Sequence, residues 1–80
     1  MKVNDAISKR IQGLLIEKDI TQYRLAKNVA MSPQTLVNIM SGKRDSANAK
    51  TIILIARGFG ITVSEFYNDP IFESKDLEID

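Results

Sequence analysis

The chain has 80 residues, of which 26% are charged, and its formal net charge is +1. This length supports one domain with a single small core and leaves no room for a deep substrate cavity. The chain contains no cysteine and no histidine, which excludes disulfides, thiol and imidazole chemistry and the usual zinc sites. No secretion signal and no apolar run near the ~18 residues of a membrane span are present, so a cytoplasmic protein is expected.

The charge is divided unevenly along the chain. Residues 1–67 hold ten Lys and Arg against five Asp and Glu, whereas residues 68–80 hold one Lys against five Asp and Glu. This division predicts a basic folded domain over residues 1–67 and an acidic tail over residues 68–80. A basic domain attracts polyanions over long distances, although two ordinary solvated surfaces would give the same counts.

Apolar residues recur three and four positions apart through most of the chain, as they do on one face of an α-helix. Helices are expected from about residue 4 or 5 to 18, 22 to 29, 33 to 40, 48 to 58 and 62 to 67. Strand patterns are nearly absent, so the prediction is an all-α, compact bundle of five helices. The expected end signals are Asn4 or Asp5 as the first cap, Gly60 as a helix stop, and Thr62 with Glu65 as a capping box.

The second and third helices are expected to form a helix-turn-helix. Ser32 can cap the third helix, and Pro33 then takes the first helical position, where its missing N–H does no harm. Only about three residues separate the two helices, and Ala26 is small enough to let them pack closely.

The tail combines a polar composition with four apolar residues. Pro70 interrupts any continuation of the last helix, and the apolar residues after it are Ile71, Phe72, Leu77 and Ile79. Two alternatives stay open for them: disorder or loose packing on the same molecule, and contact with a second subunit.

Several short motifs follow one another in a fixed order. They are Ile20-Thr21-Gln22, Leu25-Ala26, the 32–39 helix, Ser41-Gly42-Lys43 and Gly60-Ile61-Thr62-Val63. With this set the sequence resembles, over residues 7–67, the Cro and phage-repressor type of helix-turn-helix DNA-binding regulators, also called XRE-like. The resemblance implies a lambda-repressor-like fold and double-stranded operator DNA as the partner. One departure is Ala30, where the family usually has a left-handed Gly, so either the turn differs or Ala accepts about 1 kcal/mol or more of strain.

Four positions near the start of the third helix are candidates for reading bases in a major groove: Gln34, Thr35, Val37 and Asn38. Gln and Asn can accept a hydrogen bond from N6 of adenine and donate one to N7, and a Val or Thr methyl group can touch the thymine methyl group. The resemblance makes Gln34 and Asn38 the principal readers. The alternative for each is a solvated polar residue on a helix surface.

Contacts to the DNA backbone are expected from both sides of this helix. Gln22 begins the second helix, where free N–H groups suit an anion, and the resemblance makes it a phosphate ligand. Lys43 and Arg44 follow the Gly42 turn within reach of a phosphate strand, with Ser41 as a weaker partner. A Lys-Arg pair in a loop can also serve solubility alone. For Arg10, Arg24 and Lys27 two alternatives stay open: a contact with the DNA backbone, or solvation of the first two helices alone.

These features predict a sequence-specific double-stranded DNA-binding transcriptional regulator, most simply a repressor. No catalytic carboxylate set with a nucleophile, no metal spacing and no phosphate loop is present, so no enzymatic activity, cofactor, metal or small-molecule ligand is expected. The alternative is an antitoxin-like or adaptor module that binds a protein on the same fold. The polar, uncharged face over residues 34–38 favours DNA, because protein-binding faces are more aromatic and apolar.

A second subunit is also expected, because one short helix reads too few base pairs for useful specificity. Leu54 lies opposite the buried stripe of the fourth helix, between Lys50 and Arg57. We therefore expect a homodimer with Leu54 and Phe72 at its interface, although a lone exposed Leu is common on protein surfaces.

Overall fold

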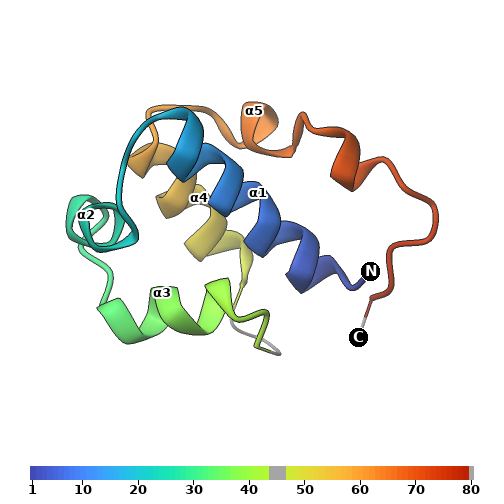
Figure 1. Cartoon of the computed structure of the whole chain (residues 1–80), viewed down its shortest axis with the longest axis horizontal. Helices are drawn as coiled ribbons and strands as arrows, with labels where there is room; N and C mark the ends of the chain where they lie inside the picture. Colours follow the sequence, from blue (N-terminus) through green and yellow to red (C-terminus); the bar gives the residue numbers. More distant parts are fainter. Residues whose placement is uncertain (44–46, 80) are drawn as a thin grey trace.

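The computed structural model describes residues 1–43 and 47–79, and in that part the chain forms five α-helices and one short 3-10 helix (Figure 1). The elements are α1 (Val3–Glu17), α2 (Gln22–Asn28), α3 (Pro33–Met40), α4 (Ala49–Gly58), α5 (Val63–Tyr67) and η1 (Pro70–Phe72). The prediction of an all-α fold with five helices is confirmed. Within the described ranges, no helix is long and apolar enough to cross a bilayer.

One apolar core joins all five helices, and its members repeat at helical spacing. The buried members are Ile7, Ile11, Leu14, Leu25, Ala26, Leu36, Ile39, Ile52, Ile55, Ala56, Phe59 and Phe66. The predicted buried stripes are thereby confirmed, with Leu15, Val29 and Met40 only partly buried at the edge of the core. Burial of these faces supplies most of the stability of such short helices, which are marginal in isolation.

The first four helices end in the same hydrogen-bond arrangement. In each, a residue with positive φ donates its N–H to the carbonyl three positions back, and the next residue donates to the carbonyl five positions back. This is the Schellman motif, which satisfies the last carbonyls of a helix. The left-handed residues are Asp19, Ala30, Gly42 and Gly60. Ala30 has a φ of 54°, so the turn between α2 and α3 keeps its left-handed backbone and the alanine accepts the strain.

The predicted capping residues are confirmed for two helices and wrong for one. Ser32 Oγ accepts from the Thr35 N–H at 3.1 Å, and Thr62 forms its capping box with Glu65. The first helix, however, begins at Val3 rather than after Asn4 or Asp5, and Lys2 at its N-cap gives no side-chain cap.

The carbonyl of Glu78 takes the place of that missing cap. It accepts from the Val3 N–H at 2.9 Å, while the Glu78 N–H donates to the Met1 carbonyl at 2.9 Å. These contacts form an isolated parallel bridge between Lys2 and Glu78, and Figure 1 shows both chain ends at the same end of the molecule. A sequence pattern for helix caps could not reveal an acceptor that comes from the far end of the chain.

The tail contacts its own molecule at two places, at η1 and at the backbone of Glu78, whereas residues 73–76 between them are exposed. The Phe72 ring lies 6.1 Å from the Phe66 ring and 5.0 Å from the Tyr67 ring, measured between centroids, and η1 contacts α1. Ile79 is 87% exposed. Of the two alternatives for the apolar tail residues, packing on the same molecule is therefore observed for Phe72.

Arg10 joins α1 to the end of α5 and to Asp69, which follows it. Its Nε donates to the Phe66 carbonyl at 2.7 Å, its Nη2 donates to the Glu65 carbonyl at 2.9 Å, and its Nη1 forms an ion pair with Asp69 at 3.3 Å. The guanidinium thus satisfies the Phe66 carbonyl at the end of α5 and adds a second donor to the Glu65 carbonyl, which also accepts from the Asn68 N–H at 3.2 Å. Arg10 therefore has a structural role in addition to its charge.

A glycine sets the distance between α4 and the helix-turn-helix. A Cβ atom at Gly58 would lie 2.4 Å from Val29 Cγ1 and 2.9 Å from Leu25 Cδ1. Such distances are too short for carbon atoms in contact, so α4 can approach α2 this closely only without a side chain at residue 58. This packing holds α2 against the core and so positions the pair α2 and α3.

Candidate nucleic-acid interface

The third helix runs along the lower edge of the molecule in Figure 1, below α1 and α4. One side of it carries mostly polar residues that are exposed or half-buried. Its buried residues are Leu36 and Ile39, which attach it to the core. Gln34 is exposed and Val37 is 45% exposed. Asn38 is less exposed than these two and is half-buried. The predicted base-reading side chains thus lie on the outer side of α3, away from the core.

Gln34 and Asn38 hold each other in one orientation. Gln34 Nε2 donates to Asn38 Oδ1 at 3.0 Å, as residues four apart on a helix can do. Among the described residues, Gln34 Oε1 and Asn38 Nδ2 have no partner, so the pair presents one acceptor and one donor outward. This combination matches the acceptor and donor demands of an adenine edge in the major groove.

Thr35 is hydrogen-bonded to the capping residue at the start of α3. Its hydroxyl lies 2.7 Å from Ser32 Oγ, and the side chain is half-buried. The predicted base-reading role of Thr35 therefore rests on its methyl group, because the hydroxyl is engaged at the helix cap.

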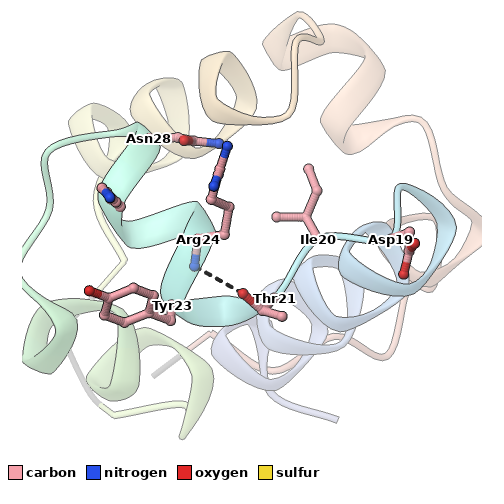
Figure 2. A pocket seen from close by; sticks show the side chains of 7 residues that line it. Asp19, Ile20, Thr21, Tyr23, Arg24 and Asn28 are labelled. Carbon is pink, nitrogen blue, oxygen red and sulfur yellow. Dashed lines mark hydrogen bonds between the residues drawn. The ribbon is translucent and has the colours of Figure 1, made fainter.

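Polar groups that could meet a phosphate strand lie at both ends of the pair of helices. Gln22 is the first residue of α2, and Thr21 caps that helix by accepting from the Arg24 N–H at 3.1 Å (Figure 2). Ser41 is exposed at the end of α3, and its hydroxyl donates to the Asn38 carbonyl at 3.0 Å. Lys43 is exposed after the Gly42 turn.

The turn after α3 is fixed to the first helix. Asn4 Nδ2 donates to the Lys43 carbonyl at 3.4 Å, and the Ser8 hydroxyl donates to the Met40 carbonyl. A Cβ at Gly42 would lie 2.6 Å from Asp5 Oδ1, so α1 and the turn are in close contact. The predicted backbone contact Arg44 lies outside the described residues.

Two basic residues and an aromatic one on α2 extend this surface beyond the predicted set. An open hollow on the outer side of α2 is lined by Asp19, Ile20, Thr21, Tyr23, Arg24, Lys27 and Asn28 (Figure 2). Arg24 and Lys27 are exposed, and Tyr23 is 71% exposed. Tyr23 was missed as a site residue, although its place outside the apolar stripe of α2 was a signal visible in the sequence.

The residues predicted for a dimer interface lie on α4 and in the tail. Leu54 is half-buried, whereas its neighbour Ile53 is 40% exposed. Phe72 is half-buried and contacts Phe66 and Tyr67 of its own chain. Part of the Phe72 ring is thus already used within one molecule, and Ile53 is the more exposed apolar residue of α4.

Comparison with known proteins agrees with this geometry. The model of a helix-turn-helix family matches residues 11–66. A solved structure, the crystal structure of the prophage Lp1 protein 11, is similar with a TM-score of 0.83 and 21% sequence identity, over 92% of this chain and 99% of that one. At that identity the likeness shows the fold alone. No curated protein is a significant match to the sequence.

Proposed function

The chain belongs to the helix-turn-helix family, of the Cro/C1 type, and from that membership we propose that it is a sequence-specific transcriptional regulator that reads double-stranded DNA. In this proposal α3 enters the major groove. The observation that carries it is the hydrogen-bonded pair of Gln34 and Asn38 on the outer face of α3. A pair of amides held in one orientation discriminates between bases without first losing side-chain freedom.

Recognition then divides into positioning and reading. Gln22, Ser41, Lys43 and Arg44 hold the phosphate strands on either side of the groove and set the depth and register of α3. Gln34 and Asn38 contact base edges, with Thr35 and Val37 supplying methyl contacts. A protein bound in this way excludes others from the same DNA, so repression is the simplest regulatory outcome.

The working form in this proposal is a homodimer. Two copies related by a two-fold axis would present two α3 helices to successive major grooves, so the half-sites are inverted and about 10 base pairs apart. Exposed apolar residues on α4 and α5 support such an interface, since Ile53 is 40% exposed and Tyr67 is 41% exposed. Leu54 and Phe72 are its other proposed members.

The second candidate function is a protein-binding module of the antitoxin or adaptor kind on the same fold. One observation favours it: Tyr23 and Val37, both well exposed, line the same groove between α2 and α3. Exposed aromatic and apolar residues are typical of protein interfaces.

Selection of bound duplexes from a random DNA pool tests the proposal. The full chain is expected to enrich one sequence with two-fold symmetry, and two chains are expected per bound duplex. Enrichment of no sequence above the starting pool would contradict the DNA-reading function. Enrichment of a site without symmetry, bound by one chain, would contradict only the dimer.

Lys43→Ala tests the backbone contacts separately. Loss of one phosphate contact should reduce the slope of log affinity against log salt by about one and weaken binding to all duplexes alike. Lys75→Ala is the control, because Lys75 is an exposed lysine in the acidic tail. An unchanged salt slope in Lys43→Ala would remove this residue from the proposed backbone contacts.

A further inference from the structure

A small apolar groove lies between α2 and α3, on the face proposed to meet DNA. It is lined by Gln22, Tyr23, Ala26, Pro33, Leu36 and Val37. Ala26 and Leu36 are 2% and 1% exposed and form its floor. Tyr23 and Val37, one from each helix, form its walls and are 71% and 45% exposed.

Tyr23 lines both this groove and the basic hollow on the outer side of α2. Figure 2 shows Tyr23 and Arg24 leaving α2 in different directions, with Arg24 toward Asn28. The phenol ring thus lies at the border of the two hollows, where it is within reach of the residues of α3 that complete the groove. Its exposure means that little of the ring is covered by the chain itself, although burial of an aromatic ring stabilises a protein or a complex.

The position of the groove determines what can fill it when DNA is bound. Gln22 and Val37 line it and also belong to the proposed contact set, so a duplex held by α3 passes directly over it. The edges of the bases in the major groove present hydrogen-bonding groups, and the 5-methyl group of thymine is the apolar exception. The groove is apolar apart from Gln22, so hydrogen-bonding base edges would lose their partners inside it.

We propose, on the basis of the function proposed above, that this groove receives the 5-methyl group of one thymine in each half-site. Val37 and the Tyr23 ring contact the methyl group from opposite sides. Tyr23 is thus a specificity-determining residue of the interface, in addition to Gln34 and Asn38. Its phenol hydroxyl, at the outer end of the ring, is free to donate to a phosphate, which adds affinity without sequence information.

Replacement of single thymines by deoxyuridine in the selected duplex tests this directly, because it removes only the methyl group and keeps base pairing. For the parent chain, one thymine per half-site should show about fourfold weaker binding on replacement, the factor expected for burial of one methyl group. That penalty should disappear in Val37→Ala and in Tyr23→Ala. It should persist in Tyr23→Phe, which keeps the ring, and in Ile16→Ala, a control at an exposed apolar position on α1.

Each other result overturns the inference in a recognisable way. Specific binding with no penalty at any thymine contradicts the methyl contact but leaves the DNA-reading function intact. The groove would then be a candidate site for a protein partner instead. A penalty that is unchanged in both Val37→Ala and Tyr23→Ala would assign the methyl contact to other residues, such as Thr35. Absence of any selected duplex would remove the proposed function together with this inference.

Discussion

The outer face of α3 and the surroundings of Arg10 use polar side chains in opposite ways. On α3 the hydrogen bonds are local, between Gln34 and Asn38 and between Ser32 and Thr35, and amide groups are left facing outward. Arg10 instead bonds groups that lie 55 to 59 positions further along the chain. One region keeps hydrogen-bonding capacity for a partner, and the other uses it to hold the fold together.

The largest effect is expected on stability, from removing the hydrogen bonds of Arg10. Arg10→Ala leaves the Phe66 carbonyl without a donor, removes one of the two donors of the Glu65 carbonyl and breaks the ion pair with Asp69. We expect the free energy of unfolding to fall by roughly 3 kcal/mol. Urea denaturation measures this change. Arg24→Ala, which removes an exposed arginine, is the control and should change stability by less than about 0.5 kcal/mol. Equal effects of the two changes would mean that Arg10 contributes charge alone.

The next largest effect is expected on DNA affinity, from a change on the outer face of α3. Asn38→Ala removes the outward amide and the acceptor that orients Gln34, and affinity for the selected duplex should fall by roughly 1 to 3 kcal/mol. Stability should change little, because the side chain is only half-buried. Asn68→Ala, at an exposed position after α5, is the control for DNA affinity. Parent-like affinity and base preference in Asn38→Ala would remove this residue from the reading set.

A smaller effect concerns the turn that joins α2 to the reading helix. Ala30→Gly relieves the left-handed strain but adds freedom to the unfolded chain, so we expect a net gain in stability of about 0.5 to 1 kcal/mol. Ala49→Gly, the same change in the first turn of α4, should destabilise by a similar amount. Thermal unfolding of both variants checks the opposite signs. A loss of stability in Ala30→Gly would show that the alanine methyl group contributes a contact larger than the strain.

The smallest effect is a pH dependence of stability that comes from Tyr67, the last residue of α5. Burial raises the pKa of the Tyr67 phenol above its ordinary value of 10.0. The folded state therefore keeps this proton at a pH where the unfolded state loses it, and stability is fully present below about pH 10 and decreases as pH rises further. Unfolding measured from pH 8 to 11 should show a steeper decrease for the parent than for Tyr67→Phe. Tyr23→Phe, at an exposed tyrosine, should follow the parent.

The features that the sequence predicts correctly are those formed between residues close together in the chain. The caps at Ser32 and Thr62, the stop at Gly60 and the buried stripes each depend on residues within one or two helical turns. The same holds for the outward position of the α3 side chains. Arg10 and the start of α1 were not predictable, because their partners lie more than 50 residues away and no spacing rule connects them.

Tyr23 shows a different limit of sequence reasoning. Its exposure followed from the apolar stripe of α2, but the groove beside it exists only because Pro33 and Val37 of the next helix complete the lining. A binding surface formed between two helices depends on their crossing geometry, which periodicity within each helix does not contain.

The backbone pairing of Val3 with Glu78 has a consequence for the order of folding. It joins residues 75 positions apart, and the entropic cost of closing a loop grows with the logarithm of its length. The short turns between consecutive helices close far smaller loops, so they can form while the chain ends are still separate. The tail is then the last segment to dock and the first to detach. In hydrogen exchange the amides of Val3 and Glu78 would report the same opening event, at a lower free energy than the amides inside α4.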